Sequence, residues 1–247
     1  MNRATKTALS TLTLLSLASL TACGGDSGSD ADSAEKPAAT ASEEKQATPE
    51  ERLKQLVITK ADVSGMDVSD ADVSSSDASE FAFAKSQQEV TVEKPVCAPL
   101  AYAMNQLPLG EPQADLTRSV SKGLNDPFTY VMLASYEPER AKSTMTDLSK
   151  AVDACADGFT AKANDNTSTY DSVTAEKPVA EAGDESLAFR STLTVLGATH
   201  TVHAQAVRSG DVLAVYFSVD GMAIANKRPS DAKLSPTVVK AQNAKLA

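Results

Sequence analysis

Two histidines, His200 and His203, are the only imidazoles in the chain and its first candidates for acid–base or metal chemistry. The pattern over residues 198–207 predicts a strand, in which side chains three residues apart point to opposite faces. Two histidines on opposite faces make a poor pair of ligands for one metal ion. We therefore expect no metal site and no cofactor, with each histidine either exposed or hydrogen-bonded.

The other residue types that support catalysis form no known motif. The chain lacks a G-x-S-x-G elbow, an H-E-x-x-H helix, a P-loop and a dinucleotide fingerprint, and no serine has a catalytic partner close in sequence. The aspartates between residues 62 and 77 lack the spacing of a calcium-binding loop and indicate a solvated acidic surface. The sequence predicts a protein that is not an enzyme, with a triad assembled across the fold as the alternative.

Cys23 follows a short segment that begins with basic residues and continues with apolar ones. Arg3 and Lys6 precede an apolar stretch, residues 8–20, which is too short to span a bilayer and is typical of a secretory signal. The junction Leu20-Thr21-Ala22-Cys23 resembles a bacterial lipobox, which implies a diacylglyceryl group on the Cys23 thiol and cleavage just before it. The alternative is a cysteine that follows an apolar stretch by coincidence.

The segment after Cys23 has the composition of a tether. Residues 24–48 contain no aromatic and no β-branched aliphatic side chain, so they cannot bury enough apolar surface to order themselves. A flexible coil of this length spans about 25–30 Å r.m.s.. We therefore divide the chain into a lipoprotein signal peptide (1–22), a disordered tether (23–47) and one folded domain (48–247).

Composition limits the function classes. The formal net charge of −10 argues against binding to a phosphate backbone, so we expect no nucleic-acid partner. Hydrophobic residues make up 42% of the chain, which is enough for a core. Aromatic residues make up only 4% and tryptophan is absent, so we expect an aliphatic core and no deep aromatic-lined pocket.

Periodicity predicts an α+β fold, an antiparallel sheet with packed helices. Thr48, Pro49 and Glu51 form a capping-box start for the first helix. The clearest helix begins at Pro138 and carries apolar residues at 4-3-4-3 spacing up to Cys155. The remaining predicted elements are a turn and strand over 64–73, a helix over 96–107, a central strand over 127–137, strands near 170–175 and over 187–195, 198–207 and 213–219, a hairpin turn at 208–211, and a closing helix from Pro236.

Cys97 and Cys155 are the two cysteines left if Cys23 carries a lipid. Both lie on the apolar faces of predicted helices, and an exported protein meets oxidising conditions. We predict one disulfide between them, with two separate buried thiols as the alternative. A redox-active pair is not expected, because the chain has no C-x-x-C motif.

Strand alternation gives the candidate ligand-binding residues. If Leu187 and Leu193 face the helices, Arg190 lies on the opposite face of the sheet. The same alternation directs Tyr216 outward, and His203 is assigned to this polar face as well. Side chains of these types can hydrogen-bond and stack, so Arg190, His203 and Tyr216 are candidate ligand-binding residues. The alternative is an ordinary solvated sheet face.

Several segments together resemble a known family. They are "LKQLVITKADVSGMDV", "PVCAPL", "FTYVMLASYE", "LSKAVDACADGF" and "VRSGDVLAVYFS". They resemble the extracellular sensor-like domain of PknH-type actinobacterial kinases and of free lipoproteins. The resemblance implies an antiparallel sheet with packed helices, a cleft and two disulfides, although this chain has cysteines for only one.

These observations predict a lipid-anchored, extracytoplasmic binding or sensing module without catalysis, held at the cell membrane through Cys23. Its partner is an unidentified envelope ligand or protein. The alternatives are a carrier or scavenger of an apolar envelope ligand and an envelope hydrolase. An internal apolar cavity favours the carrier, a convergent His/Ser/Asp site favours the hydrolase, and an open polar sheet face favours partner binding.

Overall fold

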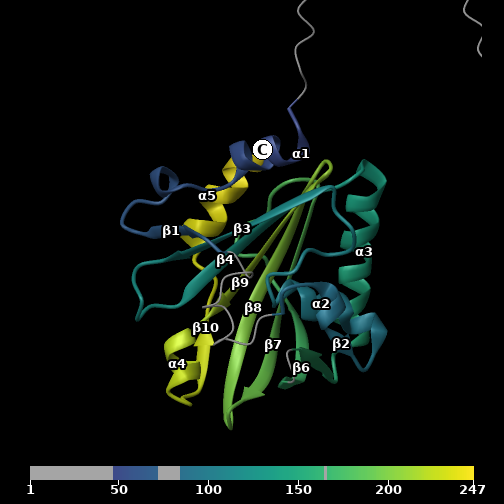
Figure 1. The fold of residues 1–247 in the computed structure, drawn as a ribbon, viewed down its shortest axis with the longest axis vertical. Helices are drawn as coiled ribbons and strands as arrows, with labels where there is room; N and C mark the ends of the chain where they lie inside the picture. The colour runs from purple at the N-terminus through teal and green to yellow at the C-terminus, as the bar shows by residue number, and fades with distance from the viewer. Residues whose placement is uncertain (1–46, 72–83, 164–165) are drawn as a thin grey trace, which may run out of the picture. The chain divides into compact units, whose positions relative to one another are not determined.

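The computed structural model describes residues 47–71, 84–163 and 166–247, which belong to one compact unit. They form ten strands and five α-helices (Figure 1), so the expected α+β class is confirmed. The predicted signal peptide, Cys23 and the predicted tether up to residue 46 lie outside the described residues. What the sequence predicts for them stays a prediction.

The strands form one twisted sheet. All pairings are antiparallel except that of β10 (Ser230–Ala232), which lies parallel to β8. In spatial order the other strands are β1 (Asp67–Asp70), β3 (Ala114–Ser121), β4 (Phe128–Ser135), β9 (Val212–Val219), β8 (Ala198–Ser209), β7 (Glu185–Val195), β6 (Asn166–Glu176), β5 (Phe159–Ala163) and β2 (Thr91–Val92).

Helices cover both faces of this sheet and produce two hydrophobic cores (Figure 1). The first core lies under α2 (Ala98–Ala103) and α3 (Pro138–Ala154), and the second lies under α1 (Pro49–Leu56) and α5 (Pro236–Leu246). Neighbouring strand residues alternate between them, so Phe217 belongs to the first core and Tyr216 to the second. The short helix α4 (Gly221–Ala225) connects β9 to β10.

Several predicted elements are confirmed. Thr48 Oγ1 accepts a hydrogen bond from the Glu51 amide at 3.2 Å, and the Glu51 carboxylate accepts from the Thr48 amide at 2.9 Å, which completes the capping box of α1. The apolar stripe of α3 is buried. The predicted central strand is β4, which lies between β3 and β9, and the turn between β8 and β9 falls at residues 210–211.

Other elements differ from the expectation. The helix expected over 96–107 is a 3₁₀ turn, Pro95–Cys97, followed by α2, because the chain leaves the helix at Met104 and Gln106 adopts a positive φ of 58°. The strands β2, β3, β5 and β10 were not among the predicted strands. β3 carries polar side chains at most of its positions, so it lacks the alternation that identifies a half-buried strand.

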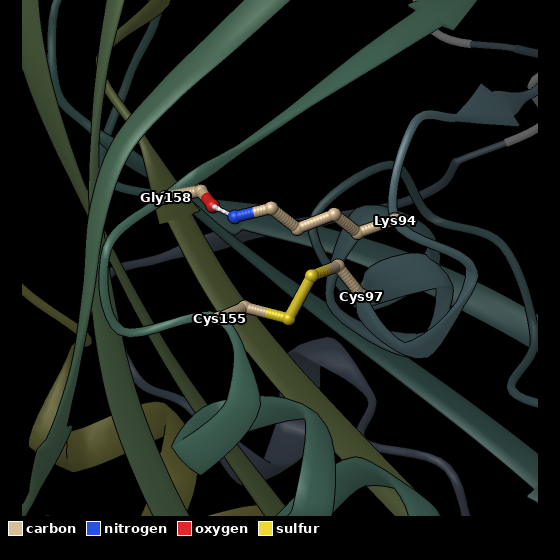
Figure 2. The surroundings of a disulfide bond; sticks show 4 residues. All are labelled: Lys94, Cys97, Cys155 and Gly158. Atoms are coloured by element: carbon tan, nitrogen blue, oxygen red, sulfur yellow. Dashed lines mark hydrogen bonds between the residues drawn. A yellow bond between two sulfur atoms is a disulfide. The ribbon is translucent and has the colours of Figure 1, made fainter.

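The structure contains the predicted Cys97–Cys155 disulfide, with the two Cα atoms 6.0 Å apart (Figure 2). Cys97 ends the 3₁₀ turn before α2, and Cys155 caps the C-terminus of α3. Lys94 Nζ donates to the Gly158 carbonyl oxygen at 3.0 Å beside the bond. The disulfide therefore joins the start of α2 to the end of α3, and both cysteines belong to the first core.

Candidate functional site

A cavity of about 210 Å³ opens at one end of the sheet, where β4 begins and β9 ends. The register pairs Phe128 with Val219 at this point. The β7–β8 hairpin, β6, β10 and α4 complete the walls. We call this cavity the strand-end pocket. Its apolar wall includes Phe128, Tyr130, Tyr170, Leu193, Val195 and Ile224.

The aromatic part of this wall is held by stacking. Tyr130 stacks on Phe217 with ring centroids 4.8 Å apart, and Tyr170 stacks on Phe159 at 4.4 Å. Burial raises the pKa of both tyrosines, and for Tyr170 a hydrogen bond from Asn105 opposes the rise. Both rings therefore stay uncharged at neutral pH. Three aromatic residues, Phe128, Tyr130 and Tyr170, thus line this pocket, whereas the sequence predicted no deep aromatic-lined pocket.

His200 is the principal polar side chain of the pocket. It is 2% exposed, and its Nδ1 lies 2.8 Å from Ser230 Oγ. Burial lowers the pKa of His200, and the nearby Asp220 carboxylate and the Val195 carbonyl only partly oppose this effect. The imidazole is therefore neutral at neutral pH. His200 and His203 point to opposite faces, as predicted, since their partners on β7 are Leu193 and Arg190.

A histidine, a serine and an aspartate thus line one pocket, but they are not arranged as a catalytic triad. A triad needs a carboxylate on the ring nitrogen that does not face the serine. His200 Nε2 has no hydrogen-bond partner among the described residues. The Asp220 carboxylate instead accepts from the Ala223 amide at 2.8 Å and caps α4. The pocket therefore contains the three residue types without the geometry of a triad.

Arg190 and His203, two of the predicted ligand-binding residues, do come together. They are direct cross-strand partners on β7 and β8. His203 Nδ1 lies 2.7 Å from Glu176 Oε2, and Arg190 Nη1 lies 3.5 Å from Oε1 of the same carboxylate. His203 Nε2 lies 2.6 Å from Asp231 Oδ1, which lowers the pKa of Asp231. His203 is buried and its ring nitrogens contact protein groups, so it is not an open ligand contact.

Tyr216 does not point to solvent as expected. It is fully buried, and its hydroxyl donates to Asn243 Oδ1 on α5 at 2.6 Å. Burial raises its pKa. On the same face, Gln205 accepts from the Val179 amide and donates to the Ala180 carbonyl, which holds the loop after β6 against the sheet. The face expected to be solvated is therefore covered by α5 and this loop near Tyr216, and Tyr216 is not a candidate ligand contact.

The strand-end pocket was not predictable from the sequence, because its walls come from segments far apart in the chain. The alternation of Phe128 and Tyr130 on one face of a predicted strand was a local signal for the aromatic wall. His200 was considered only as half of a metal pair. No pattern in the sequence places Ser230 beside it, since β10 is a short strand after a turn.

Within the described residues, no group of three or more histidine, cysteine, aspartate or glutamate side chains has the geometry to hold a metal ion. None of the described helices is both long enough and apolar enough to cross a bilayer.

No protein-family model matches the chain, and no curated protein matches it in sequence. Among solved structures, the extracellular domain of PknH from Mycobacterium tuberculosis is similar, with a TM-score of 0.49 and 12% identity over 81% of this chain and 95% of that one. It is a domain of the type that the sequence motifs resemble.

Proposed function

We propose that this protein is an extracytoplasmic binding module, tethered to the membrane through a lipid on Cys23, that takes a small and largely apolar ligand in the strand-end pocket. The observation that supports the proposal is the pocket itself, which combines aromatic and aliphatic walls with a buried imidazole. Pockets of this composition are the usual sites of small-molecule binding. The Cys23 lipid and the extracytoplasmic address come from the sequence.

The cavity volume limits the size of the ligand. A dry cavity of roughly 150 Å³ holds one benzene molecule, and drug-sized ligands occupy roughly 300–1,000 Å³. At about 210 Å³, the strand-end pocket accommodates one substituted ring or a short alkyl chain. A whole envelope lipid is too large, so a lipid ligand enters only with the end of a chain. The His200–Ser230 pair provides one polar contact.

Binding fits the pocket better than catalysis does. The neutral imidazole of His200 contacts a serine hydroxyl, but no described carboxylate orients the ring through Nε2. The same pocket serves a sensor that reports the ligand to a partner and a carrier that delivers it. Between the functions expected from sequence, the cavity favours recognition of an apolar molecule over recognition of a protein on an open polar sheet face.

Filling the pocket tests ligand binding. Ser168 lines the pocket from β6, whereas the next residue, Thr169, is exposed and points to the other face. We expect Ser168→Phe to lower the affinity for indole, a ring of suitable size, at least tenfold, because the added ring occupies the cavity. Thr169→Phe is the matched control and should bind indole as the native chain does. Isothermal titration calorimetry on the three proteins measures the difference.

Two outcomes would contradict the ligand proposal. One is a native chain that does not bind indole or other single-ring compounds of similar size. The other is equal affinity in Ser168→Phe and the native chain, with circular dichroism showing that both are folded.

The membrane anchor has a separate test. We expect Cys23→Ala to abolish the lipid mass increment and to make the protein extractable from the membrane fraction by high salt, because no other residue of a lipobox accepts the diacylglyceryl group and salt screens any remaining electrostatic attraction. Ser27→Ala, four residues further along, should keep the mass increment and the resistance to salt extraction. Fractionation and intact mass spectrometry of protein from its own host give the result. A Cys23→Ala protein that stays in the membrane with the same mass increment would contradict the anchor.

A further inference from the structure

Three large apolar side chains are exposed on connections at the end of the sheet where the strand-end pocket opens. Leu124, in the β3–β4 connection, is 82% exposed, Leu196 at the tip of the β7–β8 hairpin is 62% exposed, and Met222 on α4 is 40% exposed. All three belong to connections at one end of the sheet, away from α1 and the C-terminus (Figure 1). Exposed apolar residues that gather around a pocket mark an interaction surface.

Leu196 is also in an unfavourable backbone conformation. Leu196 and Gly197 form a two-residue turn between Val195 and Ala198, with φ values of 51° and 83°. Turns with two positive φ angles favour asparagine or glycine, and a leucine in this region costs free energy. An exposed leucine at such a position contributes little to folding, so its apolar side chain points to a role at the surface.

Basic residues accompany these side chains. Lys122, Lys227 and Arg228 are exposed and form no ion pair with any described residue. Two acidic residues, Asp126 and Asp220, lie in the same connections, and Asp220 is engaged in capping α4. Within these two connections the three basic residues therefore outnumber the two acidic ones, in a chain whose formal net charge is −10.

We propose that this end of the domain docks onto an anionic lipid bilayer. The docking surface consists of Leu124, Leu196, Met222, Lys122, Lys227 and Arg228. Apolar side chains of a peripheral protein enter the headgroup–acyl boundary, while neighbouring basic residues are attracted to anionic headgroups. Charge complementarity favours an anionic membrane as the occupant, because the three cations lack partners in the described part of the domain.

Docking in this orientation brings the pocket mouth to the lipid. Phe128, Val195 and Ile224 line the pocket and lie next to the exposed loops. An apolar ligand then passes between bilayer and pocket without crossing water, a step that rests on the proposed function. The tether permits the orientation: its 25 residues reach up to about 85 Å when extended, whereas the longest strand, with 12 residues, spans about 40 Å.

Vesicle binding tests the surface directly. The chain from residue 23 onward with Cys23→Ser carries no thiol-linked lipid, and it retains both hydrophobic cores, which lie within residues 53–246. We expect it to sediment with vesicles of equal parts phosphatidylglycerol and phosphatidylcholine, and far less with phosphatidylcholine alone. Each basic residue contributes a factor of roughly five at an anionic surface. Replacing Lys122, Lys227 and Arg228 by Gln should therefore weaken binding about a hundredfold.

A matched variant controls for general electrostatics. Replacing Lys54, Lys142 and Lys240 by Gln removes the same charge from exposed positions on α1, α3 and α5, and it should leave vesicle binding nearly unchanged. Equal losses in the two triple variants would overturn the proposal, as would equal binding to neutral and anionic vesicles.

Leu196→Asn separates docking from folding. Asparagine is favoured at a positive φ, so this variant should be at least as stable as the native chain and yet bind anionic vesicles several-fold more weakly. Unchanged vesicle binding in Leu196→Asn combined with Leu124→Ser and Met222→Ser would overturn the proposal. Ser168→Phe should keep vesicle binding while losing indole. Indole binding without vesicle binding would leave the proposed function in place and remove only the docking.

Discussion

Replacing both Cys97 and Cys155 by alanine should lower the free energy of unfolding by about 4 kcal/mol. The bond closes a loop across a sequence separation of 58, and its loss returns that conformational entropy to the unfolded chain. Both cysteines are fully buried in the first core, so the substitution also removes packing between α2 and α3. Urea denaturation monitored by circular dichroism measures the change.

Two control measurements separate the effect of the disulfide from other effects of the substitutions. Reducing the native protein should produce most of the same loss, because it breaks the bond without removing the sulfur atoms. Cys23→Ala should leave the unfolding midpoint unchanged. A double alanine variant within about 1 kcal/mol of the native chain would show that packing alone holds α2 and α3 together.

Gly158→Ala should destabilise the domain by roughly 2–5 kcal/mol. Gly158 precedes β5 and has a φ of 82°, and a Cβ there would lie 2.1 Å from the Tyr170 carbonyl oxygen. That contact is with backbone, so relief requires β5 and β6 to separate, at the register where Phe159 pairs with Tyr170.

Gly197→Ala is the matched control, because Gly197 has nearly the same φ, 83°, and open space where the Cβ would lie. Gly197→Ala should lower the free energy of unfolding by only about 1–2 kcal/mol, the cost of placing an alanine at a positive φ. Thermal or urea unfolding of both variants compares them. Equal losses of unfolding free energy in Gly158→Ala and Gly197→Ala would mean that the backbone at Gly158 moves without disturbing the β5–β6 pairing.

Elements with strong local signals were predictable. Thr48 and Glu51 fix the start of α1 through neighbours in sequence, and the α3 stripe repeats at a helical period over 17 residues. The Cys97–Cys155 pairing followed from a count of cysteines together with their positions on apolar faces. Each of these predictions depends on residues that are close in sequence or, for the disulfide, on the number of cysteines in the chain.

Features that depend on packing between distant segments were not predictable. The alternation that assigns Tyr216 to the face opposite Phe217 is correct, but solvation of that face depends on where α5 lies. α5 buries Gln242 against the end of α1 and Asn243 against Tyr216 of the sheet, and amides look like surface residues in a sequence. The strand-end pocket was missed for a related reason, because its walls meet only after β4, β6, β8 and α4 have assembled.

The time at which the disulfide forms determines when the domain reaches its full stability. In a reducing cytosol the Cys97 and Cys155 thiols stay reduced and form no bond. The free energy of unfolding is then lower by the roughly 4 kcal/mol that the disulfide contributes. Small domains are typically stable by only about 5–15 kcal/mol, so this deficit raises the fraction of molecules that are open at any moment. The export that the sequence predicts would carry the chain in this reduced and less stable form. Oxidation outside the cytosol would then form the bond and hold the start of α2 against the end of α3.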